Sequence, residues 1–587
     1  MKFFIPIILC CSLLSQAQTT YHINPDIPLS TVNGNTYVPG DSILFQRGGD
    51  WSGTLTITDN GAHSNPIYIG AYGSGNKPII GGRVAWPGWN NTSNWVAVSG
   101  RPNVWRFVGS YTNTQDKTHR IWLNGVEYPR ARDSSEISTR YRASYLSETY
   151  IFWVYAPSNP ATYYTSIEYP GEQTGTINLY GVNHITIEDL DVRGSIGGTI
   201  DMSNARHIEI RRCDVGRDAG HIGIRSMNLM DSVTIASCTI NSGDTCKDYF
   251  QFQHGLQDGI AMNAGTHNYT IWNNTVANWG HSDIEFTSAL QDNTSKTKGG
   301  YTMSNVSIMY NYLTGAGVDY VRPAGFDVGS THLTTNIRFR YNYCDSFTVR
   351  CQVETAGMDF SYNILKNFRN LGITGASVEN TGQAIMVTGY SGTNPKNMTI
   401  VGNTIENTDE AGITMATADG YNGVSGNIVE NNLLINCAMA PMYDYVDAHI
   451  ALLLSYPWET NTFRNNLVYK SGTTNFFYDA RRSTGQQWMS VAGFNAANGT
   501  SIGTVSGNIS TAPLTAGGVT YYTGSGYTVG AGWEQLPTST STWPDNVTLT
   551  TQPATWNIGS FAYAVPVVPG NKFVLKAGGK VTLKTGR

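Results

Sequence analysis

Hydrophobic and polar residues alternate in a short unit that recurs ten times between residues 185 and 468. The units read ITIEDLDV, IEIRRCDV, VTIASCTI, YTIWNNTV, VSIMYNYL, IRFRYNYC, MDFSYNIL, MTIVGNTI, NIVENNLL and NTFRNNLV. Alternation with a period of two is typical of a β-strand that buries one face. The sixth positions of successive units lie between 21 and 40 residues apart, so each repeat can hold one coil of a solenoid and a loop of variable length.

The sixth position of the unit is its most regular feature. It is occupied in turn by Leu190, Cys213, Cys238, Asn274, Asn311, Asn342, Asn363, Asn403, Asn432 and Asn466. Asn tolerates left-handed backbone, and its side-chain amide can bond neighbouring backbone groups. If the coils stack in register, each amide can donate to the next, and the seven Asn residues are predicted to form a ladder inside a turn.

A second alternating strand follows most units. Its predicted inward pairs are Ile200/Met202, Ile222/Ile224, Ile260/Met262, Ile284/Phe286, Phe326/Val328, Cys351/Val353, Ile385/Val387 and Ile413/Met415. Two strands per repeat, each with one buried face, predict an all-β protein in which every coil covers the next, that is, a parallel solenoid.

With these repeats the chain resembles the right-handed parallel β-helix proteins, a group that includes pectate lyases, polygalacturonases, alginate and chondroitin lyases and several glycosidases. The resemblance covers roughly residues 20–90 and 175–480. The segments GDSILFQRGGDWSG and NPIYIGAYGSGNKPIIGG look like the N-terminal coils of exported bacterial enzymes of this kind. The resemblance implies a right-handed parallel β-helix that degrades a polysaccharide, and it does not choose a reaction.

Breaks in the repeat divide the chain into segments. Residues 86–172 are rich in Trp and contain a hairpin-like LNGVEYPRA, which predicts an inserted antiparallel β module. The predicted segments are a signal peptide (1–17), N-terminal coils or cap (18–85), the inserted module (86–172), the main β-helix with the active-site face (173–484), C-terminal coils or cap (485–565) and a short tail (566–587).

Composition narrows the class of protein further. Lys and Arg total 37 against 42 Asp and Glu, a net charge of -5, which argues against nucleic-acid binding. Lys2 precedes the apolar stretch FFIPIILCCSLL, which is too short to span a bilayer and ends near small residues, as in a cleaved secretory signal. We therefore expect a secreted or periplasmic monomer without membrane insertion, whose partner is a polysaccharide or oligosaccharide.

The cysteines show no zinc-binding spacing. Two of the eight lie in the signal segment, and the remaining six are Cys213, Cys238, Cys246, Cys344, Cys351 and Cys437. Buried small hydrophobic residues are the simplest interpretation. A disulfide such as Cys238–Cys246 is conceivable, but the spacing does not indicate it.

Acidic residues gather on three successive predicted coils, although only 13% of the chain is charged. They are Asp283, Glu285, Asp327 and Glu354. Because coils stack about 4.8 Å apart, Glu285 and Asp327 are expected one coil apart and Glu285 and Glu354 two coils apart. Glycosidic bond cleavage needs a proton donor and a second carboxylate at separations of this order, of roughly 5 to 9.5 Å.

We therefore predict a glycoside hydrolase without a cofactor, in which Glu285, Asp327 and Glu354 supply the acid and the base or nucleophile. The predicted substrate-binding residues are Asp283, Arg350, Arg225, Asn263, His221, Arg322 and Tyr320. His254 and Asp258 flank the segment GLQ and can reach the site from its edge. Loop aromatics suit stacking against sugars, although packing against the solenoid wall explains any single ring more simply. They are Tyr249, Phe250, Phe252, Tyr320, Tyr443 and Tyr445.

Other interpretations of the acidic cluster stay open. The acids Asp283, Glu285, Asp327 and Glu354 can instead hold Ca²⁺ for a polysaccharide lyase, since Ca²⁺ takes several oxygen ligands. A lyase then needs a base, for which the candidates are His221, Arg225, Lys247, His281, Arg322 and Arg350. Neither the motif set typical of polygalacturonases nor the Glu-Glu-Lys arrangement of related lyases is present. The acids can also be a solvated strand face in a non-catalytic carbohydrate-binding or adhesin solenoid.

Overall fold

The structure is a computed structural model of the whole chain, and it is described here for part of the sequence. The described residues are 18–109, 120–128, 134–139, 143–146, 151–171, 175–227, 229–243, 258–263, 265–287, 302–315, 322–327, 333–353, 355–370, 381–389, 396–417, 425–441, 448–453, 460–480, 482, 487–497, 503–510, 512, 514–516 and 519–521. The predicted signal peptide and C-terminal tail lie outside them.

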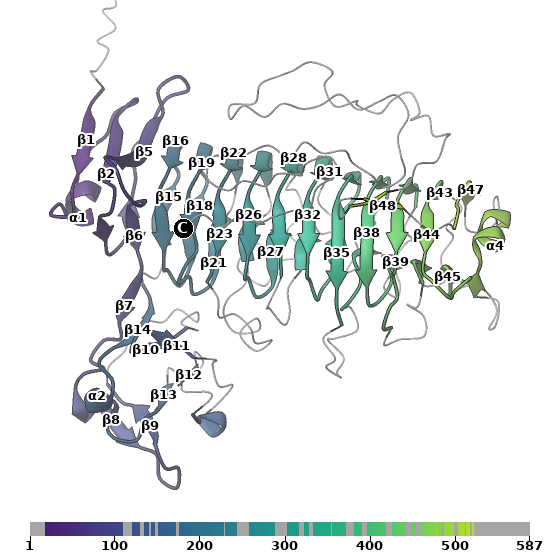
Figure 1. Cartoon of the computed structure of the whole chain (residues 1–587). Coiled ribbons are helices and arrows are strands. Elements are labelled where there is room, and N and C mark those ends of the chain that lie inside the picture. The colour runs from purple at the N-terminus through teal and green to yellow at the C-terminus, as the bar shows by residue number, and fades with distance from the viewer. Residues whose placement is uncertain are drawn as a thin grey trace, which may run out of the picture.

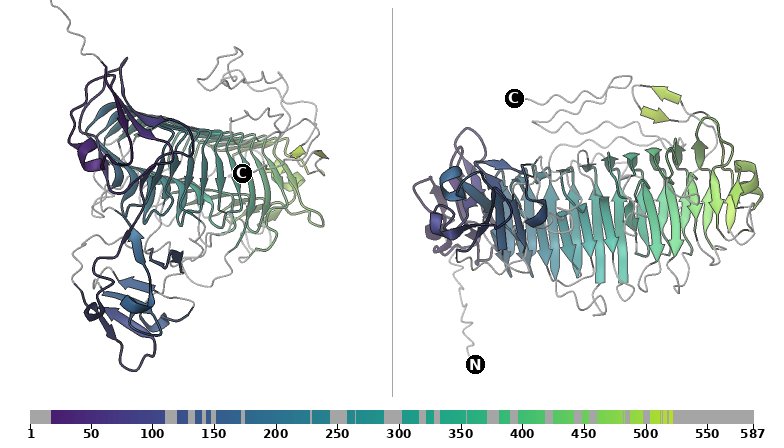
Figure 2. Two further views of the ribbon diagram at one scale, coloured as in Figure 1. Left: turned by 60° about the vertical axis from the view of Figure 1, so that its left-hand side comes forward. Right: turned by 90° about the horizontal axis from the view of Figure 1, so that it is seen from below.

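Three long sheets run side by side along the molecule and form a parallel β-helix (Figure 1). A full coil contributes one strand to each sheet, in the order sheet C, sheet A, sheet B. Figure 2 shows the same stack from two further directions, with the inserted module projecting from the N-terminal end of the solenoid. The fold predicted from the repeats is confirmed.

Sheet A contains the strands of the repeated sequence unit, and all its neighbouring strands are parallel. In spatial order it consists of β1 (Thr20–Ile23), β2 (Ser42–Gln46), β5 (Ile67–Tyr72), β16 (Asn183–Glu188), β19 (Arg206–Arg211), β22 (Met230–Ala236), β25 (Thr266–Trp272), β28 (Thr302–Met309), β31 (Leu333–Arg340), β34 (Met358–Ser361), β37 (Thr399–Val401), β40 (Ile428–Glu430), β43 (Thr462–Arg464) and β47 (Thr504–Ser506).

Sheet B holds the short strands that follow the Asn positions. It consists of β3 (Asp50–Trp51), β6 (Ile79–Gly81), β17 (Asp191–Arg193), β20 (Asp214–Val215), β23 (Thr239–Asn241), β26 (Thr275–Ala277), β29 (Tyr312–Thr314), β32 (Tyr343–Asp345), β35 (Ile364–Phe368), β38 (Thr404–Thr408), β41 (Leu433–Ile435) and β44 (Leu467–Tyr469).

Sheet C corresponds to the second predicted strand and carries the candidate site. It consists of β4 (Leu55–Thr56), β15 (Gly175–Tyr180), β18 (Gly198–Ser203), β21 (Ile222–Met227), β24 (Asp258–Asn263), β27 (Ser282–Thr287), β30 (Arg322–Asp327), β33 (Cys351–Val353), β36 (Ile385–Gly389), β39 (Ile413–Thr417), β42 (Ile450–Leu452), β45 (Phe477–Asp479) and β46 (Trp488–Met489). Its strands are parallel except for the last pair.

The interior of the solenoid is one continuous apolar core. Equivalent residues of successive coils lie over one another, as Ile185, Ile208 and Val233 do in sheet A. Aromatic rings follow the same rule, and Phe286 stacks on Phe326 with ring centroids 5.4 Å apart. Burial of this kind contributes about 1.5–3 kcal/mol to the folding free energy for each large side chain, so stacking in register stabilises the solenoid.

The predicted asparagine ladder is present. The amide of Asn274 donates to Asn311 Oδ1 at 3.0 Å, and the same bond repeats from coil to coil as far as Asn466. Two residues that the sequence did not reveal, Asn508 and Asn495, continue the ladder at the C-terminal end. The ladder therefore extends beyond the recognisable repeats.

One detail of the predicted ladder is wrong. The left-handed backbone belongs to the residue before each ladder Asn rather than to the Asn itself. Examples are Tyr310, Tyr341 and Tyr362, with φ near +60°. The turn is made by the preceding residue, and this frees the Asn side chain to point inward and bond the next coil.

Two sheet C strands are shifted by two residues from their predicted register. The first is β21, in which Ile222 and Ile224 were predicted to point inward. In the structure the inward residues are Ile224 and Ser226, which align with Ile200 and Met202. Ser226 can occupy an inward place because the Tyr269 hydroxyl donates to its Oγ at 2.7 Å within the core. The second shifted strand is β30, where Ala324 aligns with Ile284.

The inserted module consists of two small antiparallel sheets with their own core. One sheet contains β7 (Arg83–Ala85), β10 (Trp122–Leu123), β11 (Val126–Glu127) and β14 (Ile167–Pro170), and the other contains β8 (Trp95–Ala97), β9 (Val104–Phe107), β12 (Ala143–Leu146) and β13 (Ile151–Tyr155). Trp86, Trp95, Phe107 and Phe152 form its centre. Arg120 links the module to the solenoid by donating to the carbonyls of Ala219 and Ser242, each at 2.9 Å.

Short helices and a hairpin complete the described elements. They are α1 (Leu29–Asn33), η1 (Thr92–Asn94), η2 (Ser134–Glu136), α2 (Pro160–Tyr163), α4 (Val491–Ala496) and the two-stranded sheet of β48 (Leu514–Ala516) and β49 (Val519–Tyr521). In the described parts of the chain, every helix is too short to cross a membrane. Five of the six predicted mature cysteines are buried free thiols, and Cys246 lies outside the described residues.

The ladder predicts a specific stability effect. Asn363 donates to Asn403 and to the Phe339 carbonyl and accepts from Asn342. Asn363→Ala is expected to lower the free energy of unfolding, by about 1–3 kcal/mol for each buried group left unpaired. Denaturant unfolding followed by circular dichroism measures the effect.

Asn336→Gly is the matched control. Asn336 makes a similar amide bond to Asn305, but both residues are exposed, and glycine tolerates the left-handed backbone at this position. The control is expected to change the unfolding midpoint little. Equal losses in the two variants would contradict a special role for the buried ladder.

Candidate functional site

The candidate site lies at the start of three consecutive strands of sheet C. The parallel register aligns Asp258 of β24 with Ser282 of β27, and Ser282 with Arg322 of β30. Glu285 projects from the same strand as Ser282 and aligns with Ala261 on one side and Gly325 on the other. Residues that are 64 positions apart in the sequence therefore meet within three coils.

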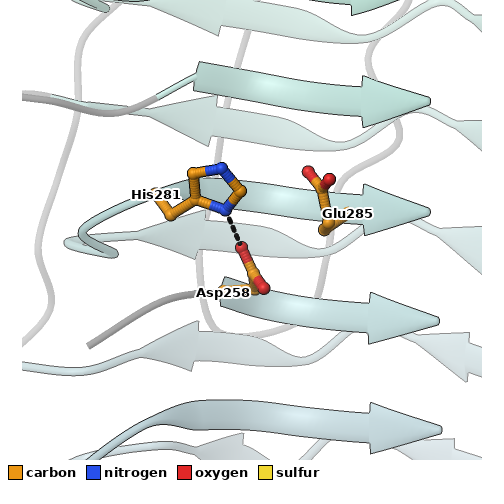
Figure 3. A group of neighbouring side chains, drawn as sticks. All are labelled: Asp258, His281 and Glu285. Atoms are coloured by element: carbon orange, nitrogen blue, oxygen red, sulfur yellow. Dashed lines mark hydrogen bonds and ion pairs between the residues drawn. The ribbon is translucent and has the colours of Figure 1, made fainter. Parts of the chain in front are cut away.

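A hydrogen bond between a histidine and a buried aspartate forms the first half of the site. His281 Nδ1 lies 2.8 Å from Asp258 Oδ1, and Figure 3 shows the imidazole ring facing this carboxylate, with Glu285 on the same side. The side chain of Asp258 is 7% exposed and that of His281 is 24% exposed. The histidine is therefore the more accessible member of the pair, and Asp258 fixes its orientation.

A glutamate–arginine ion pair forms the second half. Arg322 donates from one terminal nitrogen to Glu285 Oε1 at 2.7 Å and from Nε to Ser282 Oγ at 2.7 Å. Its other terminal nitrogen donates to Gln352 at 2.9 Å, and Ser282 Oγ donates to Glu285 Oε2 at 2.7 Å. Each oxygen of Glu285 thus has a donor, as a buried carboxylate requires to stay ionised.

Gly325 makes room for this ion pair. A Cβ at this position would lie 2.2 Å from Glu285 Oε2 and 2.7 Å from the guanidinium carbon of Arg322. Both contacts are shorter than van der Waals packing allows, so any larger residue would displace the pair. The register of β30 places this glycine directly beside Glu285.

The two carboxyl groups differ in their electrostatic surroundings. Burial raises the pKa of Asp258 to about 7, and the charge of Arg322 opposes this shift only in part. Burial also raises the pKa of Glu285, but Arg322, His281 and the Ser282 hydroxyl all favour its ionised form. Near neutral pH the Asp258–His281 pair can therefore hold a transferable proton, while Glu285 is the better stabilised anion.

Within the described residues, Asp258, His281 and Glu285 also form a group that could hold a metal ion. Each offers one ligand atom, and these atoms lie within 4.8 Å of one another. Two carboxylates and an imidazole suit a divalent cation with mixed oxygen and nitrogen ligands. This set differs from the four acids predicted from the sequence and shares only Glu285 with them.

Two of the predicted site residues, Glu285 and Arg322, meet in this cluster, but the predicted stacking of the acids is wrong. Because β30 is shifted by two residues, Asp327 aligns with Thr287, and Gly325 takes the place next to Glu285. Glu285 and Asp327 are therefore not equivalent positions of adjacent coils.

Asp283 was expected on the outer face, and this prediction is also wrong. Its side chain is fully buried, and the backbone of Thr314 only partly offsets the effect of this burial on the carboxyl group. At the equivalent position of the preceding coil, a Cβ on Gly259 would meet Val276 and Trp279 of the interior. This position therefore points into the corner of the solenoid, and Asp283 can serve neither as a substrate contact nor as a Ca²⁺ ligand on the outer face.

The remaining predicted residues lie around the cluster or outside the described parts. Arg225 aligns with Ala261 and pairs with Asp201, while His221 and Arg350 lie directly before β21 and β33 with buried side chains. Asn263 and Asp327 are the last residues of β24 and β30, and their side chains are not among those described. Residues outside the described parts are Glu354, Tyr320, Lys247, His254, Tyr249, Phe250, Phe252, Tyr443 and Tyr445.

Sequence reasoning underestimated Asp258 and His281. Both were considered separately, one as an edge residue and the other as a base. The signal that joins them is register: Asp258 aligns with Ser282 of the next coil, and His281 is the residue directly before Ser282. Ser282 and Gln352 carried no recognisable signal.

Comparison with known proteins gives only distant structural matches. No protein-family model matches the chain, and no curated protein matches it. Among solved structures, an alginate lyase from Paenibacillus sp. str. FPU-7 aligns with a TM-score of 0.35 and 14% identity over 70% of this chain and 94% of that chain. The complex of XylC with xylose aligns with a TM-score of 0.36 and 12% identity over 78% and 76% of the two chains.

A GH136 lacto-N-biosidase from Eubacterium ramulus aligns with a TM-score of 0.31 and 12% identity over 84% of this chain and 67% of that chain. None of these three alignments reaches a TM-score of 0.5, so they decide neither substrate nor reaction. The class of protein follows from the fold itself, a parallel β-helix with an inserted antiparallel module.

The buried Asp283 predicts a pH-dependent stability. Burial raises its pKa well above the usual value, whereas in the unfolded chain the group titrates near its reference value of about 3.9. The folded state thus keeps a proton that the unfolded state loses, and stability falls as pH rises above about 4. Asp283→Asn mimics the protonated form and is expected to raise the free energy of unfolding at pH 8 by roughly 1–3 kcal/mol.

Unfolding midpoints at pH 5 and pH 8 test this prediction. The gain should be smaller at pH 5, where more of the wild-type carboxyl is protonated. Asp214→Asn, at an exposed residue paired with Lys77, is the control and should show no such gain. A variant no more stable than wild type at pH 8 would contradict the placement of Asp283.

Proposed function

We propose that this protein is an exported polysaccharide-degrading enzyme, a glycoside hydrolase whose active site is the Asp258–His281–Glu285–Arg322 cluster. The observation that carries the proposal is that two carboxyl groups from adjacent coils lie close together in unequal environments. Hydrolysis of a glycosidic bond needs this inequality, because one group must give a proton and the other must act as an anion.

The Asp258–His281 pair is the proposed proton donor. The hydrogen bond at 2.8 Å lets the two groups share a proton, and the pKa of about 7 keeps that proton available near neutral pH. His281, the more exposed of the two, gives the proton to the leaving oxygen. Asp258 stabilises the positive charge that the imidazole ring carries when it is protonated. Histidine–carboxylate pairs commonly act in this way in acid–base catalysis.

Glu285 is the proposed second carboxylate. Arg322 and Ser282 hold its two oxygens in a fixed orientation, and the positive charge favours the anion that a nucleophile or base must be. Its ligand oxygen lies within 4.8 Å of the ligand atoms of both Asp258 and His281. This spacing resembles the roughly 5 Å of retaining enzymes more than the 6.5–9.5 Å of inverting ones, so it favours retention.

A polysaccharide lyase is the second candidate, favoured by the same three residues as a metal set. In that mechanism a cation on Asp258 and Glu285 would bind a uronate carboxylate, and the base would be a nearby residue such as His281. The hydrolase is preferred because both oxygens of Glu285 already accept hydrogen bonds, one from the positively charged Arg322 and one from Ser282, and these donors compete with a metal cation for the carboxylate.

The two reactions leave different products. A panel of plant and algal polysaccharides, assayed for reducing ends and for the ultraviolet absorbance of unsaturated products, separates them. The hydrolase proposal expects reducing ends without absorbance and no effect of a chelator. Absorbance that a chelator abolishes would establish the lyase instead, and binding without cleavage would indicate a non-catalytic carbohydrate-binding solenoid.

Substitution of the two carboxyl groups tests the site. Asp258→Asn and Glu285→Gln are each expected to lower kcat by at least about a hundredfold, the usual contribution of an acid, base or nucleophile. The control is Asp359→Asn, which breaks a partly buried pair with Arg340 on sheet A. Circular dichroism should show an intact fold in all three.

The pH dependence of kcat/KM gives a second readout of the same assignment. The proton donor must be protonated, so the activity of the wild-type enzyme is expected to fall as pH rises through about 7. In Asp258→Asn this alkaline limb should shift, because the group that shares the proton with His281 no longer titrates. Full activity in both carboxyl variants would rule out this site.

A further inference from the structure

An exposed aromatic ring lies on the same sheet as the candidate site. Tyr180 is the last residue of β15 and is 45% exposed, although most large side chains of the described solenoid are buried. Within the described residues it is the only exposed large aromatic residue on sheet C. An exposed ring at a fixed place is a suitable stacking surface for the apolar face of a sugar.

The hydroxyl end of Tyr180 lies near an ion pair that serves as its anchor. The pair joins Asp201 and Arg225, with Nε of Arg225 3.1 Å from Asp201 Oδ2. Burial and the charge of Asp201 raise the pKa of Tyr180 to about 12, so the hydroxyl keeps its proton near neutral pH. The polar end of the ring therefore faces the anchor, while part of the ring is exposed to water.

Glycines make space for this anchor. A Cβ on Gly175 would lie 2.9 Å from Asp201 Cβ, and a Cβ on Gly198 would lie 2.6 Å from Arg225 Cβ. Both distances are too short for packed carbon atoms. The Asp201–Arg225 pair thus fills a place formed by two successive coils, as the Glu285–Arg322 pair does beside Gly325.

A straight row of sheet C joins the anchor to the candidate active site. In register, Asp201 is followed by Arg225, Ala261 and Glu285. Four coil steps separate β15 from β27, about 19 Å at a spacing of about 4.8 Å per strand. A sugar chain lying along the solenoid axis would reach Tyr180 only when it is several units long.

We propose that Tyr180 is a remote sugar-stacking platform that selects long substrate chains for the site at Glu285. The inference rests on the proposed function, because it needs a carbohydrate chain that occupies the Glu285 site. It assigns to Tyr180 a role in binding alone, without contact to the reacting atoms. The enzyme is therefore selective for polysaccharides and long oligosaccharides over short fragments.

Kinetics on long and short substrates test the platform. Tyr180→Ala should raise KM for a long chain about tenfold with kcat within twofold, and should leave the kinetics on a disaccharide or trisaccharide of the same sugar unchanged. Tyr180→Phe retains the ring but loses the hydroxyl that faces Asp201 and Arg225, so its KM for long chains should lie between those of wild type and Tyr180→Ala. Tyr163→Ala is the control, because Tyr163 has a similar exposure of 41% but belongs to the inserted module.

Binding without cleavage separates this inference from the proposed reaction. In the Glu285→Gln background, affinity for the long chain, measured by affinity electrophoresis, should fall about tenfold on adding Tyr180→Ala and remain unchanged on adding Tyr163→Ala. This result would support the platform even if the products showed a lyase rather than a hydrolase.

Two outcomes overturn the inference. One is an unchanged KM and affinity for long chains in Tyr180→Ala. The other is an equal loss on short and long substrates, which would mark a structural effect on the site. If wild type cleaves no polysaccharide yet binds long chains through Tyr180, the proposed function fails while the platform stands.

Discussion

The register of one coil against the next is the constraint on which the rest of this protein depends. Parallel pairing in three sheets, stacked apolar side chains and a buried asparagine ladder all require equivalent residues to lie over one another. A shift of two residues in one strand changes which side chains are neighbours, as β30 shows: it places Gly325 rather than Asp327 beside Glu285. Chemistry on the solenoid wall is therefore set by register as much as by composition.

The regular stacking of the coils places partners next to the buried charged groups of the candidate site, whose burial would otherwise destabilise the fold. Burial of Asp258 and Glu285 is unfavourable for their charged forms, and His281, Ser282 and Arg322 compensate by hydrogen bonds and opposite charge. Glu285 has more of these stabilising partners than Asp258, so the two neighbouring carboxyl groups differ in how readily they ionise. A rigid wall preserves the arrangement because each partner comes from a strand fixed on both sides by its neighbours.

The sequence was sufficient to predict the solenoid and the ladder from Asn274 to Asn466, because the same residue types recur at the same positions. It predicted two strands per coil, whereas each recurring unit spans a turn and contributes strands to both sheet A and sheet B, so a full coil has three. The sequence was insufficient to predict side-chain directions in coils whose strands depart from the repeat pattern. Ser226 points inward because Tyr269 bonds it, and Asp283 points inward because its position lies at a corner. Glu285 and Arg322 were both anticipated, but their contact depends on register, and the pKa of Asp258 depends on burial that local sequence does not reveal.

The most direct test is a crystal structure of the Glu285→Gln variant with a bound oligosaccharide from the polysaccharide it degrades. The account predicts a sugar chain along sheet C, with a glycosidic oxygen within hydrogen-bonding distance of His281 or Asp258 and the anomeric carbon facing residue 285. A chain bound to sheet A, or to the inserted module with sheet C empty, would contradict it.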